Sequence, residues 1–480
     1  MIEIDGKSLA LPDIVAVADG ASVTLTAAAK ERMTASQESA VATSLKRPVY
    51  GRSTGVGANR SVSLAATDGG DTHGLQLLRS HAVDAGRPLD RRTIRAMLVV
   101  RLSQLAAGAS GIDPAIAEAL AELINADVVP EVREFGGIGT ADLQALSGTA
   151  LTMLGERRPL GGGETRRFVE SWATADALPF ISSSALTIAQ AVLAHEDLSR
   201  LLDSAAAVAA LSFVAMSGNV EALSPAVAAA ADTPAVAEAA NLFHGLVQGS
   251  GQPARIQDPY CLRTLPQIFG SQKEELEALG SLLRRLVTAG NENPLIHGSL
   301  TDGSNDVAHH GLFQVTNLAR RVDTLQLAIA AACATHLRRI DLLCDPSYTG
   351  LHPFLAEDGS GQSGVMMLEY VAAAAVGRIR ANAPVSTQTV VLSLGAEEDA
   401  SFASVAAAQL QSTVQALATV TAVELVCAAR ALRLQGRQPD EFASPTLRSM
   451  MAAGYDLPAD VTDRDLRGDV EQALRLVRRN

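Results

Sequence analysis

Two glycine-rich segments of this 480-residue chain have residue types and spacing that could support chemistry. The first reads YGRSTGVGANRS from Tyr50, with glycines at 51, 55 and 57, and the second reads PEVREFGGIGTADLQALS from Pro130. This glycine density predicts loops whose backbone takes conformations that other residues resist, either for chemistry or for tight packing. The first loop lacks the Lys-Ser/Thr pair that closes a phosphate-binding loop, so a nucleotide phosphate is not the predicted ligand.

A metal site is not predicted. His309 and His310 are adjacent, but no further ligand follows them at zinc-like spacing. Four cysteines are scattered along the chain: Cys261, Cys333, Cys344 and Cys427. They also lack metal-ligand spacing, and their apolar surroundings indicate reduced thiols.

The composition describes the scaffold that must position these loops. The chain is 48% apolar but only 3% aromatic, which favours closely packed helices with a core of alanine, leucine and valine. A net charge of −13 opposes binding to nucleic acid, and no basic stripe is present. No apolar run approaches the roughly 20 residues of a membrane span, and residues 1–20 do not resemble a signal peptide. We expect a cytoplasmic protein without nucleic-acid or membrane partners.

Three long segments without proline have helical patterns that are apolar on most faces, at residues 185–216, 315–344 and 402–435. The second would be about 45 Å long at 1.5 Å per residue. Such helices must be buried against one another. The sequence therefore predicts a mainly all-α chain, with an N-terminal domain at residues 1–180 that carries both glycine loops and a long-helix bundle domain at residues 181–480 with a C-terminal helical tail.

Several of these segments resemble the aromatic amino acid lyases, the family of histidine, phenylalanine and tyrosine ammonia-lyases. The Tyr50 loop is similar to a Tyr-Gly-Val-Asn-Thr-Gly-Phe-Gly run, and QDPYCLRTLPQ from Gln257 matches Gln-Asp-Pro-Tyr-Ser-Leu-Arg-Cys-x-Pro-Gln almost letter for letter. Collinear matches cover roughly residues 45–450. The resemblance implies the ammonia-lyase/fumarase-like fold, a loop-rich N-terminal part with a central bundle of long helices. It also implies a homotetramer whose active sites combine residues from different subunits.

The resemblance assigns candidate roles in binding and proton abstraction. Tyr50 would take the proton from the β-carbon of the substrate, although a phenol with a pKa of about 10 is a poor base unless its surroundings lower that value. Arg263 would pair with the carboxylate of a small amino-acid-like substrate, since a guanidinium suits that geometry. The remaining positions would line the site: His81, Gln257, Tyr260 and Glu398. Tyr50, Tyr260 and His309 are the candidate catalytic residues.

The family's signature loop cyclises an Ala-Ser-Gly triad into the electrophile methylidene-imidazolone, and that triad is absent here. Alignment on Asp142 without a gap puts Gly139, Thr140 and Ala141 on the triad. Thr140 could then dehydrate, but the attacking amide would belong to Ala141, whose Cβ crowds the ring closure. Alignment on the glycines instead puts Thr140 and Ala141 on Ala-Ser, which leaves no hydroxyl to eliminate. We favour an ordinary tight turn in which Asp142 caps the following helix, and we expect no cofactor.

Three other residues that differ from the family would lie on the side of the site where the family has its electrophile. Ser182 stands where the family has an asparagine, His309 replaces a phenylalanine, and Gly377 replaces a glutamate. Serine offers one rotatable donor where the amide had two donors and a carbonyl, and Ser182 to Ser184 could instead cap a helix. An imidazole at position 309 adds a titratable donor.

Three hypotheses follow. In the first, the enzyme abstracts a proton through Tyr50 and expels a β-leaving group or isomerises its substrate without an internal electrophile, and His309 is the general acid. In the second, it is a conventional ammonia-lyase with a variant electrophile from Gly139-Thr140-Ala141. In the third, it is an inactive homologue with a binding or scaffold role.

Overall fold

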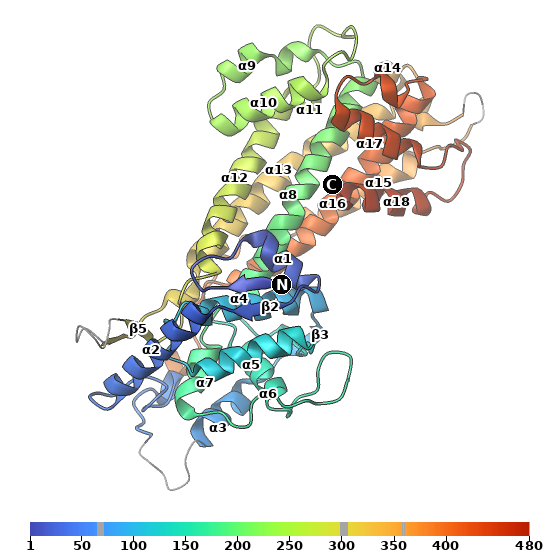
Figure 1. Ribbon diagram of the computed structural model, residues 1–480. Helices are drawn as coiled ribbons and strands as arrows, with labels where there is room; N and C mark the ends of the chain where they lie inside the picture. Colours follow the sequence, from blue (N-terminus) through green and yellow to red (C-terminus); the bar gives the residue numbers. More distant parts are fainter. Residues whose placement is uncertain (65–71, 298–305, 358, 360, 480) are drawn as a thin grey trace. The chain divides into compact units, whose positions relative to one another are not determined.

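The structure is a computed structural model that describes residues 1–64, 72–297, 306–357, 359 and 361–479 (Figure 1). It is mostly helical, and the strands in these ranges form three two-stranded sheets. The predicted mainly all-α class is therefore confirmed.

The chain folds into two compact units, each discontinuous in sequence. Unit 1 comprises Met1–Glu196, Leu279–Asp323 and Pro384–Ala408. Unit 2 comprises Asp197–Ala278, Thr324–Ala383 and Gln409–Asn480. Four helices contribute residues to both units: α8 (Ala185–Ala215), α12 (Leu265–Leu286), α13 (Thr316–Leu343) and α16 (Ala403–Leu434). The sequence predicts one domain boundary at residue 180. The contacts in the structure group the chain differently, because it returns to unit 1 at residues 279–323 and 384–408.

Unit 1 contains short helices and all three sheets. Its other helices are α1 (Leu11–Ala18), α2 (Ala27–Ser44), α3 (Thr72–His81), α4 (Arg91–Ala106), α5 (Pro114–Asn125), α6 (Leu143–Met153) and α7 (Thr174–Ile181). The strand pairs are β1 (Ile2–Ile4) with β2 (Val23–Leu25), parallel, and β3 (Ala85–Pro88) with β4 (Arg133–Phe135) and β5 (Leu295–His297) with β6 (Asp306–Ala308), both antiparallel.

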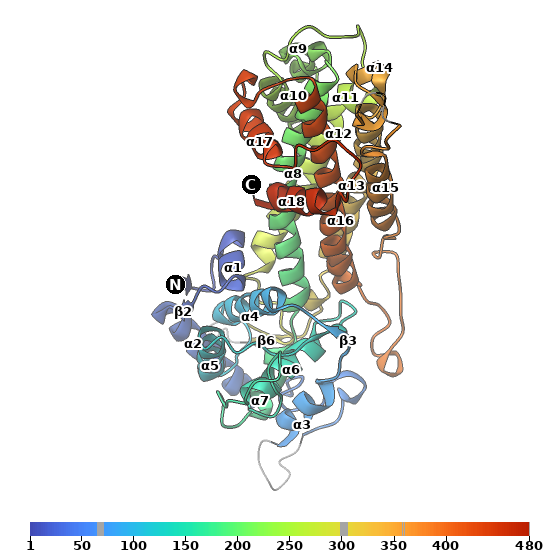
Figure 2. The ribbon, with the colours of Figure 1, turned by 90° about the vertical axis from the view of Figure 1, so that its right-hand side faces the viewer.

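Local sequence explains where these helices begin and how they pack. Asp113 precedes a proline and its carboxylate accepts the Ala115 N–H at 2.9 Å, which caps α5 as its sequence predicts. Helix α3 packs against α6 and α7 in both views (Figures 1 and 2). A Cβ at Gly74 of α3 would lie 2.7 Å from the Cα of Thr174 at the start of α7, so glycine permits this close approach.

Unit 2 contains the remaining helices and the rest of the four long ones. Its shorter helices are α9 (Pro225–Ala229), α10 (Pro234–Leu246), α11 (Tyr260–Arg263), α14 (Pro346–Thr349), α15 (Met366–Arg380), α17 (Pro445–Tyr455) and α18 (Arg467–Arg479). Two apolar stretches, Thr174–Ala215 and Ala403–Leu434, are long enough to cross a membrane by composition alone, so the expectation that no run approaches that length is too strict. Their apolar windows are 94% and 72% buried in the protein, which is typical of core helices.

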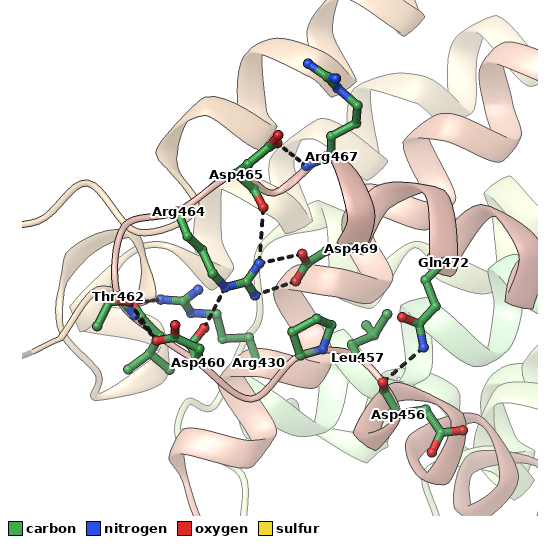
Figure 3. Close-up of polar contacts among 12 residues, drawn as sticks. Arg430, Asp456, Leu457, Asp460, Thr462, Arg464, Asp465, Arg467, Asp469 and Gln472 are labelled. Atoms are coloured by element: carbon green, nitrogen blue, oxygen red, sulfur yellow. Dashed lines mark hydrogen bonds and ion pairs between the residues drawn. The ribbon is translucent and has the colours of Figure 1, made fainter.

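The C-terminal tail is helical and is attached by arginine side chains (Figure 3). Arg464 contacts both carboxylate oxygens of Asp469 at 2.7 Å, which holds the turn before α18 in place. Arg430 of α16 donates to the Leu355 carbonyl at 2.9 Å and to the Val461 carbonyl at 2.5 Å. These two contacts join the segment before α18 to α16 and to Leu355 in unit 2.

Candidate active site

A cavity of about 1200 Å³ lies entirely within unit 1. It brings together seven of the residues singled out from the sequence: Tyr50, His81, Thr140, Ala141, Ser182, His309 and Glu398. Both glycine loops therefore meet at one cavity, as expected if they form a single site. Among the described residues, no group of three His, Cys, Asp or Glu side chains could hold a metal ion.

Tyr50 is half-buried and held at two points. Its phenol oxygen accepts the Gly57 backbone N–H at 2.8 Å, and its own backbone N–H donates to Nε2 of His309 at 3.1 Å. Burial raises the pKa of Tyr50, the hydrogen bond from Gly57 opposes this, and the Glu397 carboxylate raises the pKa further. The lowered pKa that a tyrosine base requires is thus not provided by the residues of this chain around the phenol.

His309 contacts Tyr50 edge to face, with ring centroids 6.4 Å apart and an interplanar angle of 89°. Its partial burial, the Arg47 guanidinium and the neighbouring imidazole of His310 lower its pKa. Since Nε2 accepts a backbone N–H, the ring is neutral with its proton on Nδ1. The general-acid role expected from the sequence would need a protonated imidazole, which this geometry disfavours.

The signature loop is fixed by residues at the start of α16. Ser401 Oγ donates to the Gly139 carbonyl at 3.0 Å, and the Phe402 N–H donates to the Ile138 carbonyl at 2.8 Å. Gly139 has a φ of +87°, and a Cβ there would lie 2.2 Å from Ser401 Oγ. Ala141 has a φ of +78°, which is strained for a residue with a Cβ. Only glycine fits at position 139, whereas the gap-free alignment places the family's alanine there.

Asp142 corrects one expectation. It precedes α6 but makes no side-chain cap there. Its carboxylate instead accepts the N–H and the hydroxyl of Thr187 in the first turn of α8, each at 2.9 Å. Complete burial raises the pKa of Asp142 to about 6 despite the hydrogen bonds from Thr187 and Leu186. The residue therefore joins the signature loop to a helix more than 40 positions along the chain.

This burial predicts a pH-dependent stability. The folded-state pKa of about 6 lies above the ordinary value of 3.8, so the native state binds the proton more tightly than the unfolded state. The contribution is full below pH 3.8 and is lost as the pH rises through 6, a total of roughly 3 kcal/mol. In Asp142→Asn this loss is absent, so the difference in free energy of unfolding between the two proteins should change by most of that amount from pH 4 to 7.5. If the free energies of unfolding of the two proteins changed in parallel with pH, the raised pKa of Asp142 would be contradicted.

The three serines before α8 do not cap that helix with their side chains. Ser182 Oγ accepts the Asn293 N–H at 3.2 Å, Ser183 Oγ donates to Gln104 at 2.6 Å, and Ser184 Oγ donates to the Phe313 carbonyl at 2.5 Å. Ser182 still lines the cavity. Its hydroxyl is partly used by the protein, and its role in anchoring a substrate stays a prediction.

Residues that the sequence reasoning missed hold the loop that carries Asn293. Glu292 and Arg101 form an ion pair at 2.7 Å with both side chains fully buried. Asn293 lines the cavity, and its side-chain oxygen accepts the His310 N–H at 3.0 Å. Arg101 directly follows the apolar run Met97–Val100 of α4, and this was the available sequence signal, because a buried arginine needs a partner.

The cavity wall is more acidic than basic. Glu397, Glu398 and Asp399 line it, whereas Arg60 is the one arginine or lysine that lines it among the residues that the structure describes. His81 also lines the cavity. Its Nδ1 donates to the Leu77 carbonyl at 2.9 Å, which leaves Nε2 as a hydrogen-bond acceptor. The charges favour a ligand with a cationic group.

Gln257, Tyr260 and Arg263 belong to unit 2 and do not line this cavity. Tyr260 is 69% exposed, and the Arg263 guanidinium lies 4.2 Å from the centre of its ring. Gly377 is also in unit 2. Their roles in binding and catalysis stay predictions.

A buried polar cluster supports α11, the turn that carries Tyr260 and Arg263. The Glu424 carboxylate accepts hydrogen bonds from Arg339 at 2.6 Å, His336 at 2.8 Å and Ser212 at 2.8 Å. Arg339 also donates to the carbonyl of Cys261 in α11 at 3.3 Å. The sequence signal was a lone glutamate in the apolar segment 402–435.

Comparison with known proteins gives consistent results. The profile of the family described as aromatic amino acid lyase matches residues 9–454. A histidine ammonia-lyase from Streptomyces coelicolor is 32% identical over 97% of this chain and 94% of its own. A solved histidine ammonia-lyase from Trypanosoma cruzi superposes with a TM-score of 0.88 at 25% identity, covering 99% and 93% of the two chains. The ergothioneine-degrading enzyme ergothionase from Treponema denticola gives 0.89 at 22% identity, covering 99% and 98%.

Proposed function

We propose that this chain, which belongs to the aromatic amino acid lyase family, is a lyase that works without methylidene-imidazolone. In this proposal Tyr50 removes the β-proton of a small amino-acid-like carboxylate, and the α-nitrogen leaves as a neutral amine. Gln257, Tyr260 and Arg263 belong to unit 2 and do not line the cavity in unit 1. In this proposal the protein is a homotetramer, and these three residues complete the cavity of another copy.

The observation that carries this proposal is the backbone at residues 139–141. Gly139 is packed against Ser401 without room for a Cβ, and Ala141 places a Cβ on the amide that would have to close the ring. In the alternative alignment, Ala141 has no hydroxyl to eliminate. The residues present therefore do not fit the family's electrophile, and the proposed reaction uses only unmodified side chains.

Elimination without an electrophile requires a substrate whose amine leaves readily. A quaternary ammonium leaves as a neutral tertiary amine and has no lone pair for an electrophile to capture. The carboxylates of Glu397 and Glu398 are suited to a cationic group of this kind. The relative from Streptomyces coelicolor is named a histidine ammonia-lyase, and His81 offers an acceptor for an azole N–H, so we propose a histidine-like skeleton.

A pair of substrates tests the proposal. Histidine and its Nα-trimethyl betaine share every atom except the three methyl groups on the leaving nitrogen. We expect the purified enzyme to convert the betaine to the unsaturated acid, followed by its ultraviolet absorbance, at a kcat/KM at least 10²-fold above that for histidine. Equal or faster turnover of histidine would overturn the proposal in favour of a conventional ammonia-lyase. Conversion of neither compound, with no binding of either by calorimetry, would favour an inactive homologue.

The conventional ammonia-lyase is the second candidate function, and the names of the relatives favour it. It requires a ring built from Gly139, Thr140 and Ala141 by loss of two water molecules. That difference in covalent structure is measurable directly.

A further inference from the structure

Strand β6 and His309, which follows it, are tied to the segment that carries Tyr50. At Tyr50 itself, the backbone N–H donates to His309 Nε2 at 3.1 Å, and the two rings meet edge to face. A backbone N–H can only donate, so this bond exists only while Nε2 carries no proton. Phenylalanine, which the family has at position 309, offers no acceptor.

The preceding residues strengthen the attachment. Arg47 forms an ion pair with Asp306 and donates to the Val307 carbonyl, both in β6. On the other side of the loop, the Gly57 N–H donates to the phenol oxygen at 2.8 Å. The phenol and the backbone of Tyr50 are therefore held separately, and His309 is the side chain that holds the backbone.

We propose that His309 is a positioning residue for Tyr50 and makes that position depend on pH. The neutral imidazole accepts the Tyr50 N–H and keeps the phenol in the cavity. The protonated ring has a hydrogen on Nε2, cannot accept, and releases the backbone N–H of Tyr50. This inference rests on the proposed role of Tyr50 as the base.

The surroundings place this switch below neutral pH. Partial burial lowers the pKa of His309 from 6.5, Arg47 and His310 lower it further, and Asp306 opposes them. Activity should therefore fall on the acid side of the ordinary imidazole pKa, as the ring gains its second proton. Around the phenol, Glu397 raises the pKa of Tyr50 and Arg60 lowers it. Those groups act on the alkaline side of the profile.

Three variants at one position separate positioning from packing. His309→Gln keeps an acceptor near the place of Nε2, His309→Phe restores the family's residue without an acceptor, and His309→Asn carries the same amide one methylene shorter. Hydrogen exchange of the Tyr50 amide, measured by mass spectrometry with fragmentation to single residues, reports the bond without any assay of activity. We expect native protection in the Gln variant and exchange about tenfold faster or more in the Phe and Asn variants.

The pH profile of kcat/KM for the betaine is the second measurement. We expect the acid limb of the native enzyme to disappear in His309→Gln, because its side-chain amide oxygen accepts the Tyr50 N–H at every pH of the profile. In His309→Phe we expect a loss of about 10²-fold, as for a small misplacement of a reacting group. An acid limb that persists in His309→Gln, or unchanged Tyr50 exchange in His309→Phe, would overturn the inference. Failure of the native enzyme to turn over the betaine would overturn the proposed function instead, and the exchange measurement would still decide the role of His309.

Discussion

Replacing Tyr50 by phenylalanine is expected to lower kcat by about 10²- to 10⁴-fold, the range for loss of a general base. The variant keeps the ring that contacts His309 and the backbone N–H that donates to it, so the loop should stay in place. It loses only the phenol oxygen that accepts the Gly57 N–H. KM should change little if the phenol acts on the reacting proton rather than on binding.

The pH profile gives this prediction a second, independent readout. Burial and Glu397 raise the pKa of Tyr50, so only a small fraction of the phenol is ionised at neutral pH. A base acts when deprotonated, and kcat/KM of the native enzyme should therefore rise with pH above 7. Tyr370→Phe is the matched control, since Tyr370 is 63% exposed on α15 and does not line the cavity. Native turnover and an unchanged alkaline rise in Tyr50→Phe would rule out the base role.

Replacing Glu424 by glutamine is expected to destabilise the protein by roughly 3–5 kcal/mol, the cost of removing one partner from a buried ion pair. Glu424 is fully buried, and the change leaves the Arg339 guanidinium without its counter-charge. Burial alone would raise the pKa of Glu424, but Arg339 and His336 outweigh it and hold the pKa at about 2. The stabilisation is therefore present above pH 4.5 and is lost as the pH falls through about 2.

Denaturant unfolding at a fixed protein concentration measures this effect, because oligomerisation makes stability depend on concentration. Glu441→Gln is the matched control: Glu441 pairs with Arg437 at 2.8 Å, but its side chain is 44% exposed. An exposed pair contributes far less to stability than a buried one. A Glu424→Gln variant as stable as this control would contradict the assignment of the cluster.

The long helices were predictable because their evidence is local. The predicted segments 185–216, 315–344 and 402–435 correspond to α8, α13 and α16 within one residue at each end. Alanine-rich runs without proline predict helices, and their burial follows from composition. The division into units was not predictable in this way, because it depends on which distant segments pack together.

The site was predictable in its membership and less so in its chemistry. Tyr50, Thr140, Ser182 and His309 meet at one cavity, as the two glycine loops and the family resemblance imply. The role of Asp142 was missed, because its partner Thr187 lies in another helix. The raised pKa of Tyr50 was missed as well, since burial is a tertiary property that the loop sequence does not encode.

The covalent state of residues 139–142 tests the central claim most directly. High-resolution mass of the intact purified chain, followed by sequencing of the peptide that contains Gly139, Thr140 and Ala141, should give the mass of the unmodified sequence. A deficit of two water molecules on that peptide would establish an internal ring and contradict the account.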